Sequence, residues 1–171
     1  SDASGGTGNV GGAVKTISSI AGAVVSGNDI YIKYGTYSEA VTCNVDGTSS
    51  DYVRWIGYYQ TRGDNPTGDQ RPTITGDGVR EYVWDYQHSQ YNSWENLIFS
   101  SATADGFTGW EINWDASNQF INCRFTNMGD AGLWTRTGFY AINCEFDNNG
   151  GEGYERTESD FGIVFINCYI H

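Results

Sequence analysis

The sequence of 171 residues has little positive charge and no long apolar run. Nine Lys and Arg residues stand against 21 Asp and Glu, which gives a net charge of −12. Nucleic acids and anionic membrane surfaces both attract basic patches, so this balance argues against either as a partner. No apolar run approaches the roughly 18 residues of a membrane-spanning helix. No basic segment followed by an apolar one indicates a signal peptide.

Histidine is also scarce, because only His88 and His171 are present. No Cys-x-x-Cys spacing occurs, and neither histidine lies near a pair of cysteines, which argues against a zinc site. With the histidines at these positions, no Ser-His-Asp or Cys-His arrangement can be proposed. The sequence therefore predicts neither zinc chemistry nor a nucleophilic triad.

What the sequence does contain is a repeat between residues 119 and 171. The step Asn-Cys returns at Asn122, Asn143 and Asn167, at intervals of 21 and 24 residues, and a weaker copy contains Asn96. A recurrence of about 20 to 50 residues is typical of solenoids, in which each repeat forms one coil. The asparagines are expected at a bend with a left-handed backbone, where their amides can bond to one another as a ladder.

Two columns of mostly apolar residues follow the asparagines. One position after each asparagine come Leu97, Cys123, Cys144 and Cys168; three positions after it come Phe99, Phe125, Phe146 and Ile170. Residues two apart on a strand share a face, so both columns are expected inside coils spaced about 4.8 Å apart. The stacked cysteine side chains run parallel at this spacing, which does not suit disulfides, and we expect buried thiols.

The repeated Ile-Asn-Cys-x-Phe unit resembles the right-handed parallel β-helix of the pectate-lyase-like superfamily. The segment from Asn28 to Val41, with Gly35-Thr36-Tyr37, also resembles the first coil of many β-helix proteins. The resemblance implies an all-β fold with three short strands per coil. That superfamily contains polysaccharide lyases, glycoside hydrolases, phage tailspikes and inert structural proteins, so the resemblance does not fix an activity.

The chain divides into three predicted segments. Residues 1–12 contain five glycines and are expected to form a flexible lead-in. Residues 13–27 carry apolar side chains at helical spacing and end at Gly27, which predicts an amphipathic helix that caps the first coil. Residues 28–171 are expected to form about six coils. Because a solenoid needs a terminal cap, we expect the β-helix to continue beyond His171, or another chain to cover this end.

Aromatic and basic residues of one predicted strand suggest a sugar-binding groove. The alignment predicts one file of aromatic residues and one of arginines: Trp110, Trp134 and Tyr154, and Arg136 and Arg156. Aromatic rings can stack on sugar faces, and guanidinium groups can bind hydroxyls or uronates. The alternative is that the aromatic file packs in the core.

Acidic residues in the loops provide the candidate catalytic groups. Asp130, Asp147 and Glu152 could act as the paired carboxylates of a glycosidase. An acidic segment with Glu152, Glu155, Glu158 and Asp160 could instead bind Ca²⁺ through oxygen ligands; no other cofactor is predicted. The alternative for both is a set of solvated turn carboxylates.

Two further patterns concern possible partners. Arg62-Gly63-Asp64 matches an adhesion tripeptide, but a tight turn with an Asx side chain is the simpler interpretation. The column Ile121, Ile142 and Ile166 precedes the asparagines. It either forms an outward apolar ridge, as in trimeric β-helix spikes, or is buried where the bend breaks the alternation.

Together these patterns favour a non-catalytic β-helix of an extracellular or virion assembly, such as a phage fibre, spike or decoration protein that binds a receptor or glycan. A cytoplasmic location remains an alternative. The second hypothesis is a polysaccharide lyase or glycoside hydrolase that acts on an acidic polysaccharide, and the third is an inert structural stalk. Carbohydrate and further copies of the chain are the expected partners.

Overall fold

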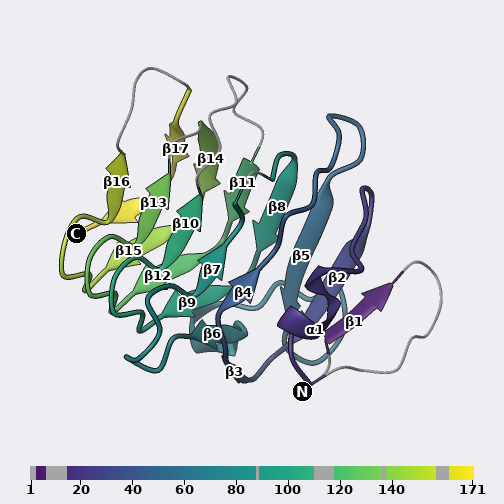
Figure 1. Cartoon of the computed structure of the whole chain (residues 1–171), viewed down its shortest axis with the longest axis horizontal. Helices are drawn as coiled ribbons and strands as arrows, with labels where there is room; N and C mark the ends of the chain where they lie inside the picture. The colour runs from purple at the N-terminus through teal and green to yellow at the C-terminus, as the bar shows by residue number, and fades with distance from the viewer. Residues whose placement is uncertain (1–2, 7–14, 88, 110–117, 136–137, 157–161) are drawn as a thin grey trace.

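The computed structural model describes residues 3–6, 15–87, 89–109, 118–135, 138–156 and 162–171. Three sheets wind around a common core and form a β-solenoid of about five turns (Figure 1). Five coils have strands in all three sheets, and a sixth has strands in two. The predicted fold class, an all-β parallel β-helix with three strands per coil, is confirmed.

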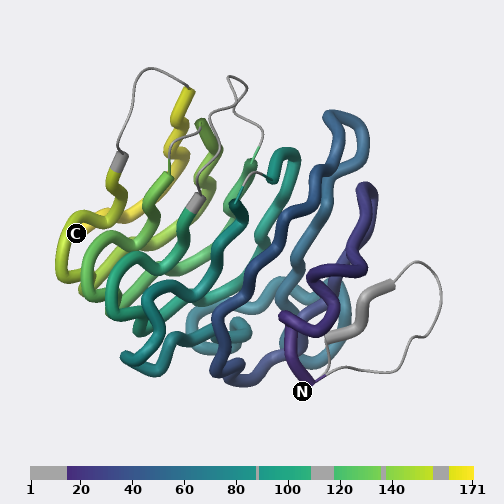
Figure 2. The backbone as a smooth tube through the Cα atoms, in the orientation of Figure 1, coloured from purple at the N-terminus to yellow at the C-terminus, as the bar shows by residue number. Residues whose placement is uncertain are grey.

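Each coil contributes one strand to each sheet in turn. Sheet A contains β1 (Ala3–Gly6), β2 (Asp29–Lys33), β5 (Val53–Tyr58), β8 (Asn92–Glu95), β11 (Asn118–Ile121), β14 (Phe139–Ile142) and β17 (Val164–Ile166). Sheet B contains β3 (Thr36–Ser38), β6 (Thr73–Thr75), β9 (Ile98–Ser100), β12 (Arg124–Thr126), β15 (Glu145–Asp147) and β18 (Tyr169–Ile170). Sheet C contains β4 (Val41–Thr42), β7 (Trp84–Asp85), β10 (Phe107–Gly109), β13 (Leu133–Thr135) and β16 (Tyr154–Arg156). The backbone trace shows the coils stacked in chain order (Figure 2).

Asparagines form the corner between sheets A and B. Asn96, Asn122, Asn143 and Asn167 have φ angles of 58°, 53°, 54° and 52°. Asn122 Nδ2 donates to Asn96 Oδ1 at 2.7 Å, and Asn167 Nδ2 donates to Asn143 Oδ1 at 2.8 Å. The predicted left-handed bend is therefore present, and the predicted amide bonds join the asparagines in two pairs. A second left-handed column, which the sequence analysis did not predict, follows sheet B at Asp77, Ser101, Asn127 and Asn148.

The core consists of side chains that stack from coil to coil. Phe99, Phe125 and Phe146 are fully buried, and the rings of Phe125 and Phe146 are stacked with centroids 4.8 Å apart. Leu97, Cys123 and Cys144 are buried beside them. Cross-strand aromatic contacts of this kind stabilise a sheet beyond the area they bury. Both predicted inward columns are thus found except in the last coil, where Cys168 is half-buried and Ile170 is 48% exposed.

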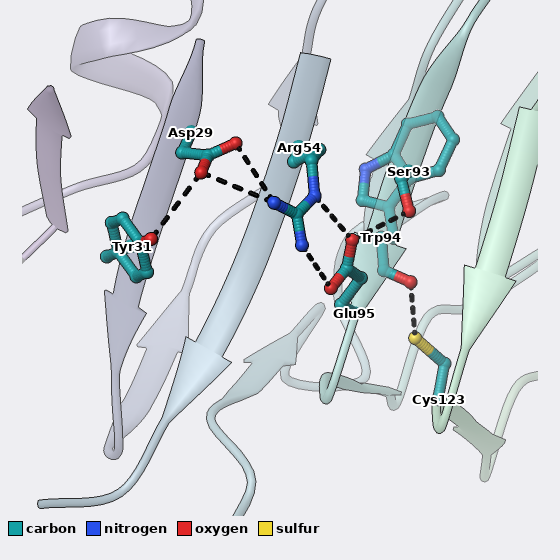
Figure 3. Close-up of polar contacts among 7 residues, drawn as sticks. All are labelled: Asp29, Tyr31, Arg54, Ser93, Trp94, Glu95 and Cys123. Atoms are coloured by element: carbon teal, nitrogen blue, oxygen red, sulfur yellow. Dashed lines mark hydrogen bonds and ion pairs between the residues drawn. The ribbon is translucent and has the colours of Figure 1, made fainter. Parts of the chain in front are cut away.

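The four cysteines are free thiols. Each stacked thiol donates to a backbone carbonyl of the preceding coil: Cys123 Sγ to Trp94 O at 3.3 Å, Cys144 Sγ to Phe120 O at 3.4 Å and Cys168 Sγ to Ala141 O at 3.2 Å (Figure 3 shows the first). The thiol thus adds a weak hydrogen bond to its apolar packing.

The predicted helix over residues 13–27 is not confirmed, because α1 covers only Ser18–Ala21. Ile17, Ala21 and Val24 are nevertheless buried against the first coil. Glycine and valine after Ala21 disfavour helix, and an isolated single turn has little intrinsic stability. Glu39 instead holds the turn, since its carboxylate accepts hydrogen bonds from the backbone N–H groups of Ile17 and Ser18 at 2.8 and 2.9 Å. Within residues 1–12, which were predicted to form a flexible lead-in, β1 pairs antiparallel with β2.

A long loop, residues 59–71, includes the 3-10 turn η1 (Gly68–Gln70) and folds over the asparagine corner. Asn122 Nδ2 donates to Pro66 O at 3.1 Å. Arg71 is 6% exposed and donates from Nη1 to Asn122 O at 3.0 Å. The start of the loop is held by Asp64, whose carboxylate accepts hydrogen bonds from the N–H groups of Tyr59, Gln60 and Thr61.

These contacts support the turn interpretation of Arg62-Gly63-Asp64. The Asp64 carboxylate is occupied by the loop backbone, and the Arg62 guanidinium lies 5.1 Å from the ring centroid of Tyr31. An adhesion tripeptide would need both charged groups to face a partner.

The outer face of sheet A changes character along the solenoid. In its first coils, Arg54 lies between two acids, with Nε 2.9 Å from Glu95 Oε1 and Nη1 3.3 Å from Asp29 Oδ2 (Figure 3). In its last coils the isoleucine column faces outward: Ile121 and Ile142 are half-buried and Ile166 is 48% exposed, while Phe120 and Ala141 fill the core. The outward alternative predicted for this column is the one observed.

Candidate functional site

The register of sheet C differs from the alignment predicted for the aromatic file. Tyr154 pairs with Leu133, and Trp134 pairs with Thr108 and Glu155. Tyr154 therefore points into the core, where its ring packs against Phe139 with centroids 5.3 Å apart. A shift of one residue moves a side chain to the opposite face of a strand, so Tyr154 cannot share a groove with Trp134. Trp110, Arg136 and the side chain of Arg156 lie outside the described residues.

An open hollow of about 320 Å³ lies on the outer face of sheet C. It is lined by Glu81, Tyr82, Asp85, Asp105, Thr108 and Trp134. The outward column of paired residues, Asp85, Thr108 and Trp134, forms its floor, because neighbouring strands place these side chains on one face. Glu81, Tyr82 and Asp105 come from the loops that lead into β7 and β10. We call this hollow the sheet C groove.

Three carboxylates gather at the margin of the sheet C groove. Oxygens of Asp105, Asp130 and Glu155 all lie within 4.8 Å of one another. They come from three successive coils that the solenoid stacks on one another: Asp105 and Asp130 from the loops before β10 and β13, and Glu155 from strand β16. A hard cation such as Ca²⁺ could contact all three through oxygen. Of the acids predicted for catalysis, only Asp130 belongs to this cluster.

The electrostatic environment sets Asp105 apart. Burial raises the pKa of its carboxyl above the ordinary value. The backbone N–H of Ala131, which donates to Oδ1 at 3.2 Å, opposes this rise in pKa. The neighbouring charges of Asp130 and Glu155 add to it. A raised pKa favours the protonated carboxyl, which is the state a general acid requires.

The environment of Asp147 indicates a role in stability instead of catalysis. Asp147 is 2% exposed and binds Arg124 through both carboxylate oxygens, at 2.8 and 2.7 Å, while Thr126 Oγ1 donates to it at 3.1 Å. The pKa of its carboxyl is lowered, chiefly by the hydrogen bond from Arg124. A buried carboxylate with these partners does not face a substrate on sheet C.

Glu152 is exposed in the loop between β15 and β16 and is not among the three clustered carboxylates. The predicted Ca²⁺ segment is also divided. Glu155 joins Asp105 and Asp130 from other coils, whereas Glu158 and Asp160 lie outside the described residues. The structure thus brings Glu155 together with acids of two other coils, whereas the predicted Ca²⁺ segment grouped acids along one loop.

A signal for the correct register was present in the sequence. Gly106, Gly132 and Gly153 each precede the inward residue of a sheet C strand, and Leu133 N donates to Gly153 O at 3.2 Å. A Cβ added at Gly132 would lie 2.7 Å from Gly153 O, so the close approach requires glycine. Alignment on these glycines places Phe107, Leu133 and Tyr154 in one column and exposes Trp134.

The fold and the groove define the class of this protein as a parallel β-helix with an acidic, aromatic-lined hollow on one sheet. Comparison with protein-family models, with curated proteins and with solved structures found no match. The resemblance to the pectate-lyase-like superfamily therefore stays a prediction. Among the described residues, no helix is long and apolar enough to cross a membrane.

Proposed function

We propose that this protein binds glycans in the sheet C groove. The observation that carries the proposal is the position of Trp134 and Tyr82 in one hollow with Asp85, Asp105 and Glu81. An indole or phenol ring offers an apolar face to a sugar, and adjacent carboxylates accept hydrogen bonds from its hydroxyls. Ligand sites combine apolar surface with a few placed polar groups in this way.

The scaffold supports the proposal as well. Asp85, Thr108 and Trp134 stand on neighbouring strands of one sheet, so their spacing is set by backbone hydrogen bonds rather than by a single loop. A chain-like ligand that runs along the stacked coils would meet a new outward side chain at each strand, about every 4.8 Å. This arrangement favours an oligosaccharide over a compact small molecule.

A glycan array with the purified chain tests the proposal. We expect retention of at least one oligosaccharide, and we expect Trp134→Ala to weaken it at least about tenfold, since stacking on an aromatic ring is lost. Tyr34→Ala is the matched control, because Tyr34 is an exposed aromatic residue that does not line the groove. If a panel of neutral, acidic and amine-bearing glycans is not retained, the proposal is wrong.

Cleavage of the bound glycan is the second candidate function. Retaining glycosidases place two carboxyl groups about 5 to 5.5 Å apart and raise the pKa of one of them. Asp105, with its raised pKa, and the nearby Asp130 and Glu155 supply these elements. A reducing-sugar assay, with measurement at 235 nm for unsaturated products, would detect the activity. Loss of turnover in Asp105→Asn, with binding retained, would assign it to this site.

For the setting we propose an extracellular or virion assembly, such as a phage fibre, spike or decoration protein. The outward column of Ile121, Ile142 and Ile166 supports a homo-oligomer, such as a trimer packed along sheet A. Sedimentation equilibrium should then give a mass above the 18.8 kDa of one chain. Ile142→Asp should lower it. A monomer at high protein concentration would contradict the assembly without affecting glycan binding.

A further inference from the structure

The charge of the sheet C groove narrows the class of glycan. Three of its six lining residues are acidic, Glu81, Asp85 and Asp105, and none is basic. Asp130 and Glu155 add two carboxylates next to Asp105. Because the walls of a groove focus the field of like charges, a uronate entering here would meet several negative groups at short range.

The carboxylates of the groove also retain acceptor capacity. One oxygen of Asp85 accepts the N–H of Gln87 at 2.9 Å, and one oxygen of Asp105 accepts the N–H of Ala131 at 3.2 Å. Within the described part of the chain, no ion pair to Lys or Arg neutralises Glu81, Asp85 or Asp105. Among these described residues, a ligand cation would therefore have no protein cation to displace from the three carboxylates.

The aromatic lining fits the same class of ligand. Trp134 lies between Thr108 and Glu155 in the outward column of sheet C. An ammonium group that lies over an indole face is attracted by the ring quadrupole, and a carboxylate on the adjacent strand adds a charge-assisted hydrogen bond. A neutral sugar would use the ring alone.

We infer that the sheet C groove selects saccharides that carry protonated amines, such as glucosamine oligomers, over N-acetylated or uronate chains. The inference rests on the proposed glycan binding and adds the chemical class of the ligand. Trp134 and Tyr82 contact the sugar rings, and Asp85, Asp105 and Glu81 hold the ammonium groups.

Calorimetric titration with three tetrasaccharides of matched length tests this inference: glucosamine, N-acetylglucosamine and galacturonic acid. We expect the glucosamine tetramer to bind at least about tenfold more tightly than the acetylated one, with a loss of affinity as salt increases. Asp85→Asn should weaken only the glucosamine tetramer. Trp134→Ala should weaken both amino-sugar ligands. Asp69→Asn, which removes an exposed acid that does not line the groove, should change neither.

The outcomes separate the inference from the function on which it rests. Equal affinity for the two amino-sugar tetramers, or tighter binding of the galacturonic acid tetramer, overturns the charge selectivity and leaves glycan binding in place. Pentalysine serves as a cationic ligand without sugar rings. Pentalysine binding as tight as that of the glucosamine tetramer would assign the effect to the net charge of −12 and overturn the inference. Failure of all three tetrasaccharides to bind overturns both proposals.

Discussion

Arg124 on β12 holds Asp147 on the adjacent strand β15 through a bidentate ion pair, with Nε 2.8 Å from Oδ1 and Nη2 2.7 Å from Oδ2. The Asp147 side chain is 3% exposed, and that of Arg124 is 27% exposed. A bidentate pair between parallel strands fixes the spacing of two coils at their margin. Its role is therefore stability, although Asp147 had been a candidate catalytic acid.

We expect Asp147→Asn to destabilise the fold by about 2 to 3 kcal/mol, because one partner of a largely buried pair is lost. The partial exposure of Arg124, and the second acid Glu145 at 3.5 Å, keep the loss below the roughly 3 to 5 kcal/mol expected for a fully buried pair. Urea unfolding at pH 7 measures this change. Glu145→Gln is the control and should change the free energy of unfolding by less than about 0.5 kcal/mol, since Glu145 is half-exposed.

The same pair predicts a pH dependence. Because the pKa of Asp147 is lowered in the folded state, its ion pair contributes fully to the free energy of unfolding above the unfolded pKa of about 3.9. This contribution is lost as the pH falls through the folded pKa. The difference in stability between the wild type and Asp147→Asn should therefore narrow below about pH 4. A difference that stays constant down to pH 2 would contradict this assignment.

The asparagine corner gives a prediction that separates backbone from side chain. Asn122→Ala loses the bonds to Asn96 and Pro66 and places alanine at a φ of 53°. We expect a loss of about 2 to 3 kcal/mol, from two hydrogen bonds and left-handed strain. Asn122→Gly removes only the bonds and should lose less, because glycine tolerates this φ. Thermal unfolding compares the two, with exposed Asn44→Ala as the control; equal losses in both variants would contradict the contribution from strain.

Asp105 gives the opposite pH dependence. Its raised pKa means that the folded state holds the proton more tightly than the unfolded state does. The protonated carboxyl therefore contributes its full stability below the unfolded pKa, and this contribution is lost as the pH rises through the folded pKa. Asp105→Asn removes the charge and keeps an acceptor for Ala131. It should be more stable than the wild type at pH 7 by a few tenths of a kcal/mol, after solvent screening, and lose this advantage below about pH 4. Unfolding by urea at pH 4 and pH 7 would show this, and a less stable variant at pH 7 would contradict it.

The buried thiols of Cys43 and Cys144 should be unreactive in the folded protein. Burial raises the pKa of Cys43 to about 12, and the pKa values of Cys144 and Cys168 are also raised, chiefly through the contact with the neighbouring thiol of the stack. Because the thiolate is the reactive form, a disulfide reagent at pH 8 should label Cys43 and Cys144 only after unfolding. Labelling followed by peptide mass spectrometry identifies each site. Rapid native labelling of Cys144 would contradict the buried stack.

The sequence predicted the corner between sheets A and B well, since one residue type marks it in four coils. Asn122 and its equivalents must adopt a left-handed backbone, and Cys123 and Phe125 must then face inward. Both the local backbone preference and the apolar alternation therefore require the same register there.

Sheet C has no such marker among its polar residues, and aromatic residues alone were misleading. Tyr154 fills the core beside Leu133, whereas Trp134 faces outward. A strand of three residues alternates inward and outward side chains too briefly to fix its register from the sequence alone. Asp130 and Glu155 were candidates in separate predicted sites, and their grouping with Asp105 was not predicted for a related reason. Asp105, Asp130 and Glu155 are 25 residues apart in sequence, and only the coil register brings them together.

The 59–71 loop has a consequence for how the molecule unfolds. In a simple linear array each unit touches only its neighbours, so the ends can melt one by one. Here a segment that leaves the second coil is tied to Asn122 in the fourth through Pro66 and Arg71. Three consecutive coils are thereby joined into one cooperative unit. Unfolding that starts at the C-terminal end is expected to stop at these contacts of Pro66 and Arg71 with Asn122.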